Sequence, residues 1–309
     1  MNTTPQPVVI GVDGSPGTAG AVRTGLDEAR RLDTPVLLVH VVPDYVPLTP
    51  MLPLAGPDLT ETGAAILRGV VAEVAAQAPD LHVDSELRHG PRAMQLVTAA
   101  HGAVALYVGR DDRPLLERVL LGNTAAGAAS RATCPVVVVP PGWAPQGGGV
   151  AARGVVVVAV KSPAHSTELL ADAFAAAATH GARLVVLHSW KLPSGYDDIV
   201  AAGVATDELT QRSTAELETL LHEWRTTFPA VQVEIRIVHD QPAQALVRAS
   251  HEADLLVLVR HAHGFPAGTL GGTGRAVLRD ADCPVRVVPP GPVSAVAGLV
   301  LEEAGDISK

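Results

Sequence analysis

Short apolar runs alternate with amphipathic segments along the first half of the chain. Four runs are almost continuously apolar, which is typical of strands covered on both faces of a parallel sheet: VVIGV (8–12), PVLLVHVV (35–42), AVALYVG (103–109) and PVVVV (135–139). HVDSELR (82–88) alternates apolar and polar residues and is expected at a sheet edge. The intervening segments predict helices over 18–31, 60–77, 92–101 and 123–132. This alternation indicates an α/β fold with a doubly wound, five-stranded parallel sheet of the flavodoxin/Rossmann type.

In the flavodoxin-like strand order, the first and fourth strands flank the point where the order reverses. Ligands of such sheets bind beyond the carboxyl ends of the strands at this point. The first strand ends at Asp13 and the fourth at Gly109. These two residues are therefore expected to lie on either side of any binding site.

The second half of the chain repeats the first. Cys134-Pro135-Val136 recurs as Cys283-Pro284-Val285, and GPRAMQLVTAAHGAVALYVGR (90–110) aligns with QPAQALVRASHEADLLVLVR (241–260). The repeat predicts two domains, over 1–141 and 154–290. A linker over 142–153 continues the Pro- and Gly-rich stretch that begins at Pro140, and a tail follows over 291–309.

Composition narrows the classes of function. The 309 residues carry a formal net charge of −9 with no basic block, which argues against a nucleic-acid-binding surface. The apolar runs are too short to span a membrane, and the polar start of the chain is unlike a signal peptide, so we expect a cytoplasmic protein. Two cysteines, Cys134 and Cys283, suit a reducing compartment and are expected to be buried.

A carboxylate at the mouth of the first strand is the first candidate for chemistry. In VVIGVDGSPG (8–17), Asp13 could accept hydrogen bonds from a ligand amine or hydroxyl, while Ser15 is predicted to cap a helix that begins at Pro16. In the second unit, GVVVVAVKSP (154–163) places Lys161 where Asp13 stands.

Several common catalytic motifs are absent from the sequence. It contains no G-x-G-x-x-G, no G-x-x-x-x-G-K-[ST] and no G-x-S-x-G. The pair His261 and His263 has no third ligand nearby in the sequence, so a metal site is not expected there. With no base or nucleophile constellation, we do not expect an enzyme.

The whole chain resembles two universal stress protein domains joined in tandem. The features that carry the resemblance are the V-x-x-G-V-D-G-S opening, the LLVHV second strand, the start of the third helix after Pro91 and the closing C-P-V-V-V-V-P, and they extend from Val8 to Pro290. Members of that family that bind ATP carry G-x-x-G, nine residues and G-[ST] between the fourth strand and the last helix. The resemblance implies that these glycines let backbone amides approach the phosphates.

The first unit keeps the spacing of this motif but not all of its residues. Asp112 replaces the second glycine and Asn123 replaces Ser or Thr, and a carboxylate beside phosphates needs Mg²⁺ or a nearby arginine to offset its charge. The site implied for an adenine nucleotide, ATP with Mg²⁺, comprises Gly11, Asp13, Val41, Val108, Gly109, Asp112, Gly122, Asn123 and Thr124. The second unit departs further, with Val259, Ala262, Gly271 and Gly272 at the motif positions, and is not expected to bind ATP.

Two functions remain open at this point: a stress-response protein that binds a nucleotide in its first unit, and a scaffold that keeps the fold without the ligand. The family's closing strand pairs across a dimer, so the resemblance implies that 136–139 and 285–288 pair the two halves as a pseudo-dimer. Further homodimer formation is left open. The Pro-rich loop over 47–57 is expected to be a lid, a partner surface or a variable surface loop.

Overall fold

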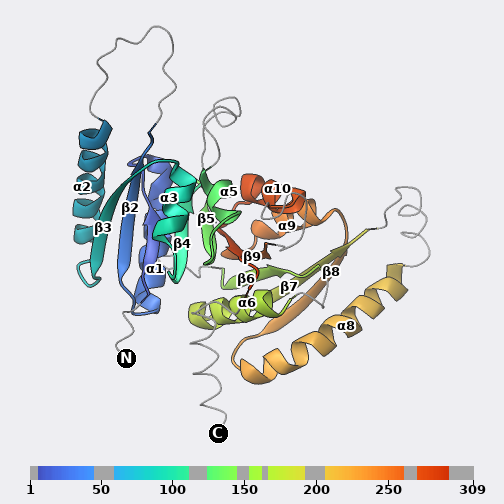
Figure 1. Ribbon diagram of the computed structural model, residues 1–309. Coiled ribbons are helices and arrows are strands. Elements are labelled where there is room, and N and C mark those ends of the chain that lie inside the picture. Colours follow the sequence, from blue (N-terminus) through green and yellow to red (C-terminus); the bar gives the residue numbers. More distant parts are fainter. Residues whose placement is uncertain are drawn as a thin grey trace, which may run out of the picture. The chain divides into compact units, whose positions relative to one another are not determined.

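The computed structural model describes residues 6–44, 59–110, 124–144, 153–161, 166–191, 206–260 and 270–291. The described chain divides into two compact units, the first ending at Ala144 (Figure 1). Several predictions fall outside the described residues: those for Asp112, Gly122, Asn123, Ala262, His261, His263, the loop over 47–57 and the tail beyond Gly291.

The first unit is a five-stranded, fully parallel sheet. Its strands have the order β3-β2-β1-β4-β5, so β1 lies between β2 and β4, and β3 is at the edge as its alternating pattern predicts. Right-handed crossovers in this order place α1 and α2 on one face and α3 and α5 on the other. The elements are β1 (Val8–Gly11), a 3₁₀ turn η1 (Pro16–Thr18), α1 (Ala19–Arg31), β2 (Val36–Val42), α2 (Leu59–Gln77), β3 (Val83–His89), α3 (Arg92–Ala99), β4 (Ala105–Gly109), α5 (Thr124–Ala129) and β5 (Val136–Val139).

The core of this unit is built from small and branched aliphatic side chains. Ile10, Leu38 and Leu106 are fully buried in the central strands. Helix α1 packs closely on β1 because Gly25 faces Ile10, and a Cβ at Gly25 would lie only 2.7 Å from Cδ1 of Ile10. The low aromatic content of the sequence thus corresponds to closely packed helix and sheet layers.

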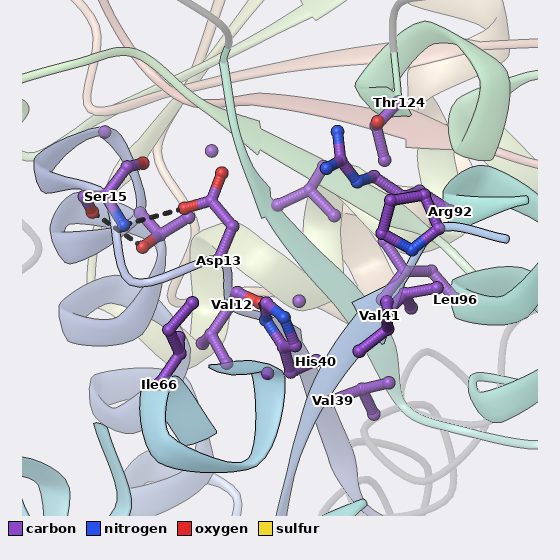
Figure 2. A pocket seen from close by; sticks show the side chains of 18 of the residues that line it. Val12, Asp13, Ser15, Val39, His40, Val41, Ile66, Arg92, Leu96 and Thr124 are labelled. Carbon is purple, nitrogen blue, oxygen red and sulfur yellow. Dashed lines mark hydrogen bonds between the residues drawn. The ribbon is translucent and has the colours of Figure 1, made fainter. Parts of the chain in front are cut away.

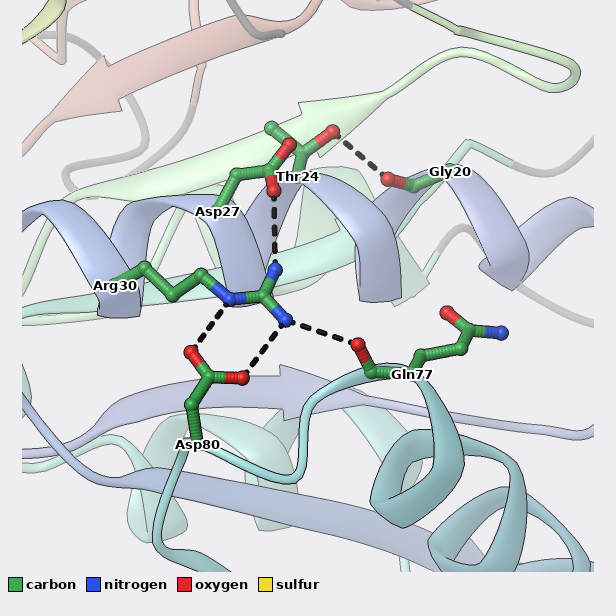
Figure 3. Close-up of polar contacts among 6 residues, drawn as sticks. All are labelled: Gly20, Thr24, Asp27, Arg30, Gln77 and Asp80. Atoms are coloured by element: carbon green, nitrogen blue, oxygen red, sulfur yellow. Dashed lines mark hydrogen bonds and ion pairs between the residues drawn. The ribbon is translucent and has the colours of Figure 1, made fainter. Parts of the chain in front are cut away.

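Polar contacts join α1 to the turn that follows α2 (Figure 3). The guanidinium of Arg30 donates from Nε to Oδ2 of Asp80 (2.9 Å) and from Nη2 to the carbonyl of Gln77 (3.0 Å). Hydrogen bonding to Arg30 lowers the pKa of Asp80, whereas burial raises the pKa of the neighbouring Asp27. These exposed pairs hold the ends of the helices in register and contribute little to stability.

The second unit repeats the first, as the sequence predicts. Its strands are also parallel, with the order β8-β7-β6-β9-β10. The equivalence extends to helix ends: α6 is followed by Gly181 at φ 59°, and α1 is followed two residues after its end by Asp33 at φ 47°. The elements are β6 (Val155–Ala159), α6 (Thr167–His180), β7 (Arg183–Trp190), α8 (Thr206–Thr227), β8 (Val233–His239), α9 (Pro242–Ser250), β9 (Leu255–Val259), α10 (Gly272–Asp280) and β10 (Val285–Val288).

The second core differs from the first in two respects. Phe174 of α6 stacks on Trp224 of α8 and on Phe228, the residue after the end of α8, with ring centroids 5.6 and 5.5 Å apart. A buried ion pair joins α6 to β10: Asp172 accepts from Nε and Nη2 of Arg286 at 2.6 and 2.9 Å. The repeat has therefore diverged inside its core as well as at its surface.

The remaining predictions have mixed outcomes. Cys134 and Cys283 are buried free thiols, as expected. Within the described residues, no helix combines the length and apolarity needed to cross a membrane. The domain boundaries and the pairing of the two closing strands stay predictions.

Candidate functional site

A cavity of about 440 Å³ opens at the carboxyl ends of the strands of the first unit (Figure 2). It lies at the switch point, where the connections from β1 and β4 turn to opposite faces of the sheet. Six of the nine predicted site residues line it: Gly11, Asp13, Val41, Val108, Gly109 and Thr124. The other three lie outside the described residues. Residues far apart in the sequence thus meet where the strand order predicts.

Asp13 shapes the turn that leaves β1. Its Oδ1 accepts a hydrogen bond from the backbone amide of Ser15 (2.9 Å), and its side chain is exposed on the cavity wall (Figure 2). The predicted helix start is confirmed in part: Ser15 occupies the N-cap position and Pro16 begins a 3₁₀ turn, but the Ser15 side chain makes no capping hydrogen bond and the α-helix begins only at Ala19. The bond that Asp13 accepts comes from the amide of Ser15 itself and uses Oδ1, so Oδ2 takes no part in it.

His40 closes the floor of the cavity beside Asp13. Its Nδ1 lies 2.8 Å from the carbonyl oxygen of Val12. Because a carbonyl can only accept, Nδ1 carries a proton and donates this hydrogen bond. No sequence motif assigned this histidine to the site, although its position two residues before the end of a buried strand places it at the switch point.

The backbone of Val41 also faces the cavity. In a parallel strand, the N–H and C=O groups of alternate residues point to opposite neighbours. The carbonyl of Val39 accepts from Val12 on the β1 side, and that of Val42 accepts from Gly90 on the β3 side. Val41 is two residues after Val39 and points the same way, so its N–H and C=O face the β1 side of the sheet, at a level where β1 has already ended.

Gly109, at the end of β4, lies in close contact with the turn that contains Gly17 and Thr18. A Cβ at Gly109 would lie 2.5 Å from the carbonyl oxygen of Gly17, a distance that no real side chain tolerates. Gly14 in the same turn adopts φ 74°. Glycine at 109 is therefore required by packing in addition to any contact with a ligand.

The opposite wall contributes polar groups, among them Thr124, which was a predicted site residue, and Arg92, which was not. Arg92, the first residue of α3, and Thr124, the first residue of α5, both line the cavity (Figure 2). Arg110 lines it as well. The signal for Arg92 was weak, because its contact with the site depends on how α3 packs on β2 and against α5.

The second unit has lost the groups that define this site. His188 contacts the carbonyl of Val160 at 2.9 Å, just as His40 contacts the carbonyl of Val12. Val160 and Val12 are therefore equivalent, and so are the residues that follow them, Lys161 and Asp13. The strand pairings give Ala159 for Gly11 and Val259 for Gly109. A cation and two added side chains therefore replace the carboxylate and both glycines.

Two doubly wound parallel units, one with a cavity at its switch point, define a tandem α/β protein of the flavodoxin-like class. The model of the universal stress protein family matches residues 5–140 and again 153–289, and the chain belongs to that family. It is 32% identical over 293 residues to a universal stress protein of Mycolicibacterium smegmatis, covering 92% of this chain and 97% of the relative.

Other relatives agree in both length and fold. Universal stress protein Rv2005c of Mycobacterium tuberculosis is 30% identical over 291 residues, covering 91% of this chain and 96% of the relative. The crystal structure of a universal stress protein from Archaeoglobus fulgidus superposes with a TM-score of 0.68 at 16% identity, covering 93% of this chain and 97% of that one. The latter likeness shows the fold alone.

Proposed function

We propose that the first unit binds an adenine nucleotide in the cavity at its switch point. The observation that carries this proposal is the convergence of Asp13, Val41, Gly109 and Thr124 on one cavity. These residues come from four separate segments of the sequence. Adenine is proposed because these are the positions that nucleotide-binding members of the family use, by the resemblance of the sequence motifs.

The chemistry of the cavity suits a nucleoside at the end that contains Asp13. The carboxylate can accept from ribose hydroxyls, and the backbone N–H and C=O of Val41 can pair with the edge of a base. A volume of about 440 Å³ is in the range of small-molecule sites, which span ~300–1,000 Å³. Among the described residues, no group of three or more His, Cys, Asp or Glu side chains is placed to hold a metal ion. ATP is therefore tested with and without Mg²⁺.

Titration calorimetry of the full chain with AMP, ADP and ATP tests this proposal. We expect binding by the wild type and a loss of at least roughly tenfold in Asp13→Asn, since a charged acceptor contributes ~1.5–3 kcal/mol to a hydrogen bond. Asp84→Asn is the matched control, because Asp84 is an exposed carboxylate on β3 away from the cavity. Absence of heat with every nucleotide would overturn the proposal, and unchanged binding by Asp13→Asn would remove the role of Asp13.

The second unit supports a different function for the other half of the chain. Lys161, Ala159 and Val259 replace the residues that form the cavity in the first unit. A unit that keeps the fold after losing these groups suits a scaffold. Lys161→Asp alone is expected to restore no nucleotide binding, because both added side chains remain.

A further inference from the structure

The cavity of the first unit has opposite charges on its two walls. Asp13 lies on one side, next to Ser15, and Arg92 lies on the other, on the side of Thr124 (Figure 2). A ligand with hydrogen-bond donors at one end and an anion at the other would bind in only one orientation. The charge on Asp13 repels the anionic end of such a ligand and favours placing it toward Arg92.

Arg92 is not engaged elsewhere in the part of the chain that the structure describes. No hydrogen bond or ion pair to another described residue involves its guanidinium, and its side chain is exposed. Two other arginines of this unit are engaged: Arg88 pairs with Glu86 at 3.0 Å, and Arg131 donates to the carbonyl of Gly127 at 3.0 Å. The five donors of Arg92 thus remain for a ligand in the cavity.

The position of Arg92 in its helix is unfavourable without such a ligand. It is the first residue of α3, where the positive end of the helix dipole disfavours a cation. In the second unit, which has lost the site, the equivalent first residue of α9 is Pro242, a residue well suited to that position. A cation that opposes local helix preferences and faces a cavity is typical of a functional group.

We infer that Arg92 is the specificity-determining residue by which this cavity distinguishes a nucleotide from the corresponding nucleoside. Its guanidinium donates to the phosphate oxygens, assisted by the hydroxyl of Thr124, while the nucleoside lies toward Asp13 and Val41. The ligand class is therefore a phosphate-bearing nucleoside, and the phosphate adjacent to the sugar is the group that Arg92 contacts. This inference rests on the proposed function.

Comparing AMP with adenosine isolates the contribution of the phosphate. We expect the wild type to bind AMP at least roughly tenfold more tightly than adenosine, as a charge-assisted hydrogen bond allows. Arg92→Ala should remove most of that preference by weakening AMP binding and changing adenosine binding by less than about twofold. Arg92→Lys should keep part of the preference, because it keeps the charge without the paired donors.

Arg68→Ala is the matched control. Arg68 is exposed on α2, outside the residues that line the cavity, and its loss changes the net charge by the same amount. It should leave both affinities unchanged. Far-ultraviolet circular dichroism and thermal unfolding of each variant verify that the fold is kept.

The outcomes separate this inference from the proposed function. If the wild type binds neither AMP nor adenosine, the proposed function fails and the inference fails with it. If the wild type binds AMP and Arg92→Ala leaves that affinity unchanged, only the inference is overturned. Equal weakening of AMP and adenosine by Arg92→Ala would also overturn it, since the residue would then shape the cavity without sensing phosphate.

Discussion

The buried ion pair of the second unit provides a quantitative test of how the two repeats diverged. Arg286 and Asp172 form a paired, two-point contact at 2.6 and 2.9 Å, and their side chains are only 3% and 1% exposed. The strand pairings make Val137 the counterpart of Arg286 in the first unit. The equivalent helix ends make Thr24 the counterpart of Asp172. Thr24 there donates to the carbonyl of Gly20 within its own helix (2.8 Å; Figure 3).

Single substitutions are expected to be costly. Arg286→Val removes the charge that neutralises the buried carboxylate of Asp172, and Asp172→Thr removes the charge that neutralises the guanidinium. Breaking a buried pair from one side lowers the free energy of unfolding by ~3–5 kcal/mol. The double variant Asp172→Thr/Arg286→Val recreates the uncharged arrangement of the first unit. Its free energy of unfolding is expected to lie within ~1–2 kcal/mol of the wild type, because replacing both partners leaves no unpaired charge at this place in the core.

Urea unfolding followed by tryptophan fluorescence measures these effects. Trp224 reports on the second unit, since it stacks on Phe174 of the same helix as Asp172. Comparing the wild type with a Trp224→Phe variant shows which part of the fluorescence change during unfolding comes from the second unit. Single variants that each lose less than ~1 kcal/mol, or a double variant that loses the sum of both singles, would refute the reasoning.

Two further predictions concern packing and titration. A Cβ at Gly69 of α2 meets no atom within 4 Å, whereas one at Gly63 would lie 2.5 Å from Cγ2 of Val42. Gly69→Ala should therefore raise the free energy of unfolding by ~0.5–1 kcal/mol and Gly63→Ala should lower it, and equal effects in thermal unfolding would contradict this. Burial raises the pKa of the Cys283 thiol from 9.0 to about 12, so the thiol loses its proton at a lower pH in the unfolded chain than in the folded one. Between pH 9 and pH 12 the free energy of unfolding therefore falls by ~1.4 kcal/mol for each unit by which the pH rises. Cys283→Ala should remove that part of the slope in urea unfolding on either side of pH 9, and identical slopes would count against it.

The order of elements could be predicted from the sequence because the signals are local. Buried parallel strands must be apolar on both faces, and the edge strand alternates because one face meets solvent. Each of the five strands predicted for the first unit overlaps an observed strand, and β3 lies at the edge. The start of α1 was less accurate, because a 3₁₀ turn over Pro16–Thr18 precedes the α-helix and the Ser15 side chain makes no capping hydrogen bond.

The sequence predicted only those parts of the candidate site that lie at the ends of strands. Asp13 and Gly109 follow from the rule that parallel strands end at one edge of the sheet, which sequence order alone implies, whereas Val41 was implied only by the family resemblance. His40 and Arg92 did not follow, because their part in the cavity depends on side-chain direction and on how α2 and α3 pack against that edge.

The sequence by itself determined the duplicated unit, the parallel α/β class and the strand ends at which a ligand would bind, because periodicity and repeat spacing are properties of the chain. The tertiary structure confirmed the sequence alignment of Lys161 with Asp13, since matching histidine–carbonyl contacts fix that equivalence. It also decided that Arg92 faces Asp13 across one cavity. The distance between two side chains 79 positions apart is set by the packing of helices on the sheet, and no local pattern encodes it.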